Sequence, residues 1–257
     1  MLEPRKHIQY FQVDASRNEP IAASTIVETP VSLTVNGEAW ISFMCTPVLL
    51  EAMAIGFLYN EGVIDSMDEV VDIRLCEHGD NVDLWLNHPV KKPAGWTRTS
   101  GCSGGVTAVD SIQKPRSVAS PNGFALPVSG INLLVEMLFD AQDLYRETGG
   151  VHTSALTDGE RILLSADDIG RHNTLDKIAG QCLMQNIWPE HRILLTTGRV
   201  SSEMLQKALR LGAGMLISRT SPSSLSIELA EKWGITLIGY ARRNCFNLYA
   251  HPERVSD

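Results

Sequence analysis

Between residues 172 and 240 the sequence alternates helical and extended segments, and this alternation limits the fold more than any other feature. Helical patterns cover 172–185, 201–211 and 223–233, and short apolar strands cover 192–197, 215–219 and 235–240. Such alternation is typical of parallel strands joined by crossover helices. The sequence therefore predicts an α/β fold, with ligands bound beyond the carboxyl ends of the strands.

The first part of the chain has another pattern and is predicted to form a smaller lobe. Residues 1–27 are typical of a loosely tethered arm, and residues 28–98 should form an α+β lobe. Within that lobe the Asn36-Gly37 pair favours a tight turn between two strands. Thr46 is the expected N-cap of the helix that follows. Residues 99–257 should then form the α/β lobe.

Two further elements are predicted at the start of the α/β lobe. The amphipathic spacing from Ile131 to Arg146 indicates one helix, which Gly149-Gly150 should end. Extended segments at 151–157 and 161–166 have the pattern of a hairpin.

Charge and cysteine content exclude several classes of protein. The formal net charge of −8 disfavours binding to duplex nucleic acid. The five cysteines are scattered without a C-x-x-C pair, which disfavours a disulfide framework or a four-cysteine zinc site and favours a reducing cytoplasm. Residues 1–10 are charged and do not resemble a signal peptide, and no apolar run reaches the length of a membrane span, so no membrane association is expected.

Cys102 differs from the other cysteines in its surroundings. It lies in the glycine-rich segment Ser100-Gly101-Cys102-Ser103-Gly104-Gly105, which builds no core element. A thiol on such a backbone can reach another molecule, so we predict a reactive nucleophile rather than a buried apolar side chain. The four other cysteines are predicted to be small buried side chains; they are Cys45, Cys76, Cys182 and Cys245.

Two strand-to-helix turns combine an arginine with several hydroxyl groups. Arg199 lies in one of these turns and Arg219 in the other. A guanidinium beside a helix N-terminus can bind phosphate. For either turn alone, the favoured interpretation is that the serines cap the helices and the arginines face solvent. Two equivalent turns on neighbouring strands favour a ligand resembling a nucleotide.

Three other polar residues are candidates to support the thiol. Asp168 and His172 flank a third strand-to-helix turn, where they could carry protons or act only in helix capping. His152 follows a double glycine on a predicted strand, and its alternative is a hydrogen-bonded core histidine.

The end of the chain combines aromatic and amide side chains. Aromatic rings can stack on a base or pterin, and an asparagine can bind its edge. The alternative is an edge strand that packs Phe246 and Leu248 inward. The candidate cofactor-binding residues are Phe246, Asn247, Leu248, Tyr249, Ala250 and His251.

Several of these segments, in chain order, resemble the FdhD/NarQ family from about residue 28 to 252. The segments are Gly56-Phe57-Leu58, Glu61-Gly62, Gly149-Gly150-Val151-His152, residues 168–177, Thr197-Gly198-Arg199, Ser202-Glu203-Met204, Pro222-Ser223-Ser224 and Phe246-Asn247-Leu248-Tyr249. The resemblance implies a fold similar to cytidine deaminases, a layered mixed sheet with helices on both faces, and a homodimer.

The resemblance also implies an activity. Members of this family are sulfur carriers required for formate dehydrogenase, which take a persulfide sulfur from a cysteine desulfurase and pass it to the molybdenum cofactor, bis-molybdopterin guanine dinucleotide. Cys102 would carry the sulfur, residues 246–251 would bind the cofactor, and Arg199 and Arg219 would contact its guanine dinucleotide. The family usually has two cysteines as C-x-x-C, and Gly105 stands at the second position here.

Zinc-dependent deamination is not expected, because the chain has no Pro-Cys-x-x-Cys pair. The remaining alternative from another class is a chaperone that binds the molybdenum cofactor for a formate dehydrogenase catalytic subunit without transferring sulfur. A nucleotide hydrolase is a weaker alternative, since no metal or triad pattern stands out in the sequence.

Overall fold

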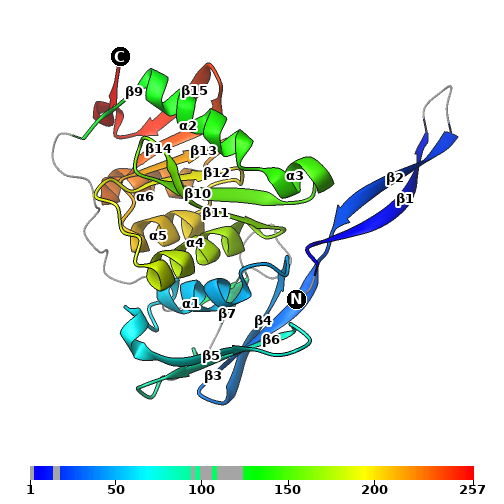
Figure 1. Cartoon of the computed structure of the whole chain (residues 1–257). Helices are drawn as coiled ribbons and strands as arrows, with labels where there is room; N and C mark the ends of the chain where they lie inside the picture. The colour runs from blue at the N-terminus through cyan, green and yellow to red at the C-terminus, as the bar shows by residue number, and fades with distance from the viewer. Residues whose placement is uncertain (1–2, 14–17, 94–95, 99–105, 109–123) are drawn as a thin grey trace.

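The computed structural model describes residues 3–13, 18–93, 96–98, 106–108 and 124–257. Its main element is a six-stranded mixed sheet in the order β11-β10-β12-β13-β14-β15 (Figure 1). The strands are β10 His152–Thr157, β11 Ile162–Asp168, β12 Ile193–Thr196, β13 Met215–Ser218, β14 Thr236–Arg242 and β15 Cys245–Ala250. Strands β12, β13 and β14 are parallel, and the others pair antiparallel. The predicted α/β class is confirmed.

Helices cover both faces of this sheet. Helix α2, Val128–Asp140, lies on one face, and α4, Arg171–Gln185, α5, Ser202–Arg210, and α6, Ser224–Trp233, lie on the other (Figure 1). The side chains of β12 alternate accordingly: Leu194 belongs to the core under α4 and α5, and Ile193 and Leu195 belong to the core under α2. Because each face is covered, these strands are apolar throughout rather than at every second residue.

A second sheet of four strands lies on the far side of α4. Its order is β4-β3-β6-β5, with β3 Thr29–Val35, β4 Glu38–Cys45, β5 Val70–Leu75 and β6 Asn81–Leu86. Helix α1, Leu50–Asn60, lies between this sheet and α4 (Figure 1). One hydrophobic cluster joins this sheet, α1, α4, α5 and the large sheet, so the two sheets share a continuous core.

Two glycines allow α1 and α4 to approach closely. A Cβ atom on Gly56 would lie 1.8 Å from the Asp176 carbonyl oxygen, and one on Gly180 would lie 1.8 Å from the Ala52 carbonyl oxygen. No larger residue fits at either position without moving a helix, so these glycines set the distance between the two layers.

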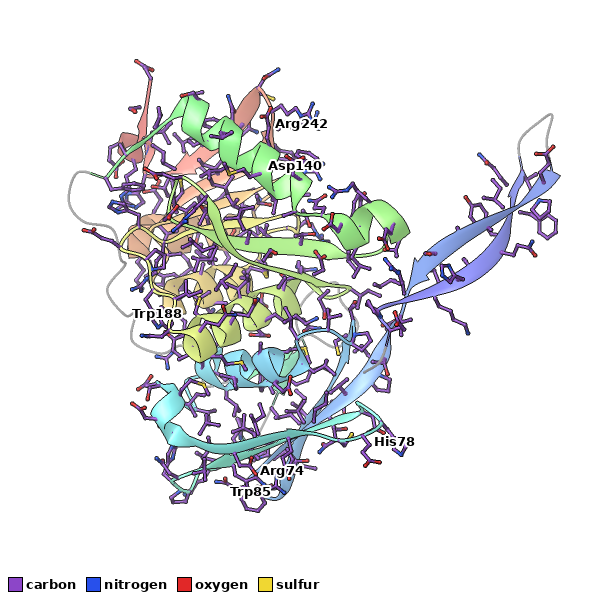
Figure 2. All side chains as sticks on the ribbon, viewed as in Figure 1. Arg74, His78, Trp85, Asp140, Trp188 and Arg242 are labelled. Carbon is purple, nitrogen blue, oxygen red and sulfur yellow. The ribbon has the colours of Figure 1, made fainter. Side chains whose placement is uncertain are left out.

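Residues 3–27 differ from the prediction of a loose arm. Strands β1, Arg5–Val13, and β2, Asn18–Ile26, form an antiparallel hairpin that projects from the body. Figure 2 shows its side chains extending away from the rest of the molecule. This pairing was not predicted from the sequence, because β1 is exposed throughout and no described side chain of β2 is fully buried, so neither strand has a buried face to set an apolar pattern.

Two predictions about helix boundaries were wrong. Thr46 does not cap α1; the N-cap is Leu49, in the left-handed region at φ 54°, and Thr46 is fully buried against α4 instead. The predicted helix from Ile131 to Arg146 is two helices, α2 and α3, Asp143–Thr148, with a break at Ala141 and Gln142. Gly149 ends α3 in the left-handed conformation, as expected of a C-terminal glycine.

The remaining elements are short. They are η1 Met67–Glu69, β7 Trp96–Arg98, β8 Val106–Ala108, β9 Leu126–Pro127, η2 Pro252–Arg254 and β16 Val255–Ser256. Strand β16 pairs in parallel with β9, which ties the end of the chain to the start of α2. Among the helices of the described residues, none combines the length and the apolar character needed to cross a membrane.

Candidate functional site

A pocket of about 400 Å³ opens at the carboxyl edge of the large sheet, between β10, β12, β13 and α3. It lies where α/β sheets bind ligands, because the strands end there and the loops diverge. Its lining residues are Gln142, Tyr145, Gly149, Gly150, Val151, His152, Ile169, Thr197, Arg219 and Thr220. Two candidate site residues from the sequence, His152 and Arg219, thus meet in one pocket.

His152 begins β10 and is half-buried in this pocket. Its Nδ1 atom lies 3.4 Å from Thr197 Oγ1. Burial lowers the pKa of His152 below its ordinary value, and the positive charge of Arg171 lowers it further. The imidazole is therefore neutral at pH 7 and can either donate or accept a hydrogen bond there.

Arg219 is held in place by an aromatic ring. Its guanidinium carbon lies 3.9 Å from the centroid of Phe139, in the last turns of α2. Burial, followed by the nearby charge of Arg242, lowers the pKa of Arg219, whereas Tyr145 raises it. An arginine stays charged in a protein, so Arg219 brings a fixed, oriented cation to the pocket. Figure 2 shows Arg242 and Asp140 at this same end of the sheet.

The two arginine turns are neighbours in space. Val200 forms a parallel bridge with Pro222, and Val200 N donates to Ser221 O at 3.1 Å. Arg199 is nevertheless exposed and does not line the pocket that contains Arg219. The sequence predicted equivalent roles, and the structure gives the two arginines different surroundings.

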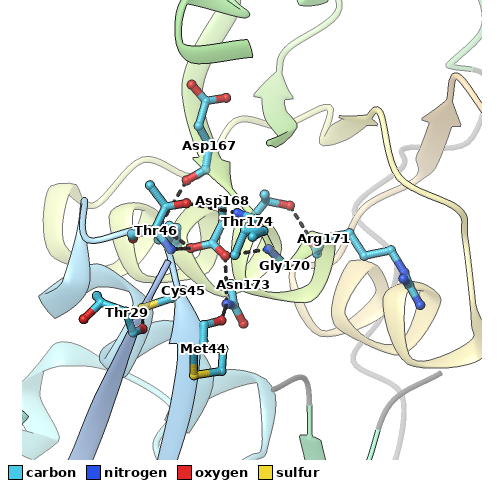
Figure 3. Close-up of polar contacts among 12 residues, drawn as sticks. Thr29, Met44, Cys45, Thr46, Asp167, Asp168, Gly170, Arg171, Asn173 and Thr174 are labelled. Atoms are coloured by element: carbon cyan, nitrogen blue, oxygen red, sulfur yellow. Dashed lines mark hydrogen bonds and ion pairs between the residues drawn. The ribbon is translucent and has the colours of Figure 1, made fainter. Parts of the chain in front are cut away.

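Asp168 lies at the centre of a buried polar cluster rather than in the pocket (Figure 3). Its Oδ2 atom accepts from Lys177 Nζ at 2.6 Å and from Thr46 N at 3.1 Å. Its Oδ1 atom accepts from Gly170 N at 2.7 Å and from Asn173 Nδ2 at 2.9 Å. These four donors give Asp168 a structural role, although it does not cap α4, whose N-cap is Gly170 and has no side-chain capping bond.

The Asp168 cluster also joins the end of β4 to α4 and the large sheet. Lys177 Nζ donates to the carbonyl oxygen of Thr46 at 3.0 Å, and Asn173 Nδ2 donates to that of Met44 at 3.0 Å. Thr46 Oγ1 in turn accepts from Ile169 N at 3.1 Å. Lys177 was missed as a key residue, although its position in the segment 168–177 was a signal, since a buried lysine needs an anionic partner.

His172 is buried in the first turn of α4, beside the start of α5. Its Nε2 atom lies 3.3 Å from Ser201 Oγ. Burial, with the charges of Lys207 and Arg171, lowers the pKa of His172 to about 2. The imidazole therefore stays neutral in the folded protein throughout the physiological pH range.

The six residues of the segment 246–251 extend along and just beyond β15 and cannot all meet at one point. Phe246 and Leu248 pack on the core under α2, as the edge-strand alternative predicted. Cys245 pairs with Arg242 at the carboxyl edge, whereas Ala250 pairs with Leu237 near the opposite edge. His251 Nε2 lies 3.1 Å from the Glu231 carbonyl oxygen there. At about 3.3 Å per residue, His251 is roughly 16 Å from Phe246 along the strand.

Cys102 lies outside the described residues, as does Gly105. Of the other cysteines, Cys45 and Cys182 are buried as predicted, and burial raises the pKa of each thiol to about 12. The prediction of burial was wrong for Cys76, which is partly exposed in the turn between β5 and β6, and for Cys245, which is exposed.

A metal site is not apparent in the part of the chain that the structure describes, where no three His, Cys, Asp or Glu side chains gather suitably. His251-Pro252-Glu253 does match the H-x-E half of a zinc deaminase signature. His251 Nδ1, however, lies 2.9 Å from Glu253 Oε1, and no Pro-Cys-x-x-Cys pair accompanies it in the sequence.

Comparison with known proteins gives one consistent result. A family model described as FdhD/NarQ family matches residues 26–256. The chain is 33% identical over 237 residues to the sulfur carrier protein FdhD of Staphylococcus aureus strain bovine RF122 / ET3-1, covering 90% of this chain and 89% of the relative. It is 34% identical over 236 residues to the same protein of strain MRSA252, with the same coverage of both chains.

A solved structure has the same fold. The crystal structure of a protein described as a formate dehydrogenase accessory protein, from Desulfotalea psychrophila, superposes with a TM-score of 0.85 at 26% identity. The match covers 99% of this chain and 100% of the other.

Proposed function

The chain belongs to the FdhD/NarQ family, and from that premise we propose that it is a cytoplasmic sulfur carrier required for formate dehydrogenase activity. In this proposal Cys102 accepts sulfur from a cysteine desulfurase and passes it to bis-molybdopterin guanine dinucleotide before that cofactor enters the formate dehydrogenase catalytic subunit. We further propose that the carrier acts as a homodimer.

The observation that carries the proposal is the pocket at the carboxyl edge of the large sheet. It combines the oriented guanidinium of Arg219, the neutral imidazole of His152 and the hydroxyl groups of Thr197 and Thr220. Such a set of donors fits the phosphates of a dinucleotide, because a guanidinium pairs with two oxygens at once and hydroxyls complete the shell.

The properties of the described cysteines support Cys102 as the carrier. A sulfur acceptor must reach the thiolate state, and the raised pKa values of Cys45 and Cys182 prevent this near neutral pH. Cys76 Sγ is engaged with Asp80 Oδ1 at 2.8 Å and with Asn81 N at 3.2 Å. Cys245 is exposed and therefore serves as the natural control for Cys102.

The chemistry of the first step is a thiol exchange without net oxidation. The Cys102 thiolate attacks the outer sulfur of the desulfurase persulfide, a new S–S bond forms on Cys102, and the electron pair of the broken S–S bond leaves with the donor cysteine thiolate. Delivery of that sulfur to molybdenum as sulfide requires two electrons from a reductant such as a thiol. With Gly105 in place of a second cysteine, such a thiol would come from outside the segment 100–105.

Mass spectrometry distinguishes this function from a chaperone that only binds the cofactor. After incubation with a cysteine desulfurase and cysteine, the wild-type chain should gain one sulfur atom on Cys102. Cys102→Ser should lose both the adduct and the activation of formate dehydrogenase, whereas Cys245→Ser and Cys76→Ser should keep both. Full activation of formate dehydrogenase by Cys102→Ser would instead establish the chaperone.

A further inference from the structure

The break between α2 and α3 leaves a buried amide without a protein partner. Gln142 lies at this break, with φ −91° and ψ 53°, angles that no regular helix has. The residue is only 2% exposed, and its Nε2 atom has no hydrogen-bond acceptor among the described residues. Buried polar groups are almost always paired, because a buried donor without an acceptor loses its hydrogen bonds to water and gains none in the protein.

The pocket at the carboxyl edge is where this amide can find an acceptor, since Gln142 lines it together with Arg219. The end of α2 positions both residues. The Phe139 ring contacts the guanidinium of Arg219, and Gln142 follows Phe139 by three residues in the chain. No aspartate or glutamate is present among the described residues that line the pocket. A guanidinium-bearing and an amide-bearing residue in one lining without carboxylates favour a ligand with several negatively charged oxygens.

We propose that Gln142 is a ligand-binding residue of this pocket, whose Nε2–H group donates to a phosphoryl oxygen of a nucleoside diphosphate. The inference rests on the proposed function, because the guanine dinucleotide of the molybdenum cofactor carries such a diphosphate. Arg219 supplies the charge, and Gln142 supplies a directed hydrogen bond that fixes which oxygen lies against α3.

Calorimetric titration of the full chain tests this role, with GDP, inorganic pyrophosphate and guanosine as probes. In Gln142→Met, which keeps the length of the side chain but removes the donor, the Kd for GDP and for pyrophosphate should rise about tenfold or more. Gln142→Glu should weaken both further, because it places a negative charge against the phosphate. Binding of guanosine should be the same in all three proteins.

Thermal unfolding without ligand separates binding from structure. Gln142→Met should melt no lower than the wild type, because it removes an unpaired buried donor. Gln181→Met is the matched control: Gln181 is also buried, but its Nε2 donates to the Ser165 carbonyl oxygen at 3.2 Å, away from the pocket. This variant should melt lower than the wild type and bind both probes normally.

Each other outcome overturns the inference. An unchanged Kd in Gln142→Met removes the role of the amide while leaving the proposed function intact. Loss of GDP binding with normal pyrophosphate binding assigns the donor to the nucleoside instead. An equal loss of binding in Gln181→Met shows general destabilisation. A wild-type chain that binds neither GDP nor pyrophosphate overturns the inference and also the cofactor-binding part of the proposed function.

Discussion

Replacing Lys177 by methionine should cost about 4 kcal/mol of unfolding free energy, because Lys177 joins the two sheets of the molecule through Asp168. Both side chains are fully buried, and Lys177 Nζ lies 2.6 Å from Asp168 Oδ2. Methionine fills a similar volume but removes the charge and three donated hydrogen bonds, two of them to the carbonyl oxygens of Thr46 and Asp167. Removing one partner of a buried ion pair lowers the free energy of unfolding by about 3–5 kcal/mol.

Urea unfolding monitored by circular dichroism measures this loss. With a denaturant slope of about 3 kcal/mol per molar, 4 kcal/mol corresponds to a midpoint lowered by about 1.3 M. Lys232→Met is the control, because Lys232 is exposed in the last turn of α6 and should shift the midpoint little.

A double-mutant cycle with Asp168→Asn isolates the pair itself. Since the double variant buries no unpaired charge, it should be more stable than the sum of the two single losses predicts, by about 2 kcal/mol or more. A loss below about 1 kcal/mol in Lys177→Met, or strict additivity in the cycle, would refute the conclusion that this ion pair joins the end of β4 to α4 and the large sheet.

Three further predictions follow from burial and close packing. Gly180→Ala should lower the melting temperature by more than 10 °C, because its Cβ would lie 1.8 Å from the Ala52 carbonyl oxygen. Gly130→Ala is the control and should have little effect, because its Cβ would meet only side-chain atoms of Pro127 and Leu126 at 3.4 Å or more. Equal melting temperatures of the two variants would contradict the packing argument. The pKa of His172 is lowered in the folded state, so its neutral form contributes stability that is present above the unfolded pKa of about 6.5 and is lost as the pH falls. At pH 5 the loss relative to pH 8 should reach about 2 kcal/mol, and chemical denaturation of His172→Gln should show a shallower pH dependence by about one proton. Among the four cysteines that the structure describes, a thiol reagent at pH 8 should label Cys245 fastest and Cys76 more slowly, and should leave Cys45 and Cys182 unmodified until the protein unfolds. Rapid labelling of either buried cysteine, detected by peptide mapping, would show that the core opens.

The candidate site was partly predictable because the sequence pattern indicates where the strands end. The alternation after residue 172 located the carboxyl edge of the sheet, and that edge brought Arg219 and His152 into one pocket. The same pattern could not separate Arg219 from Arg199. Their difference depends on Phe139, which lies 80 residues from Arg219 in the sequence and stacks on only one of the two.

Local sequence by itself determined the elements whose signals are local: the parallel strands β12 to β14, the helices between them, and the Asn36-Gly37 turn. Apolar periodicity and turn chemistry act over a few residues, so they can be read without knowing the fold. Only the tertiary structure determined the surroundings of Thr46, Gln142 and Lys177, because the residues around each of them are distant in the sequence. Thr46 does not cap α1 and instead binds Ile169 and Lys177, and Gln142 is the N-cap of α3 at a break that the apolar periodicity of the sequence does not show. Whether a polar group is buried, and with which partner, depends on the residues that pack against it. Those residues come from different layers of the fold, so no single segment of the sequence contains this information.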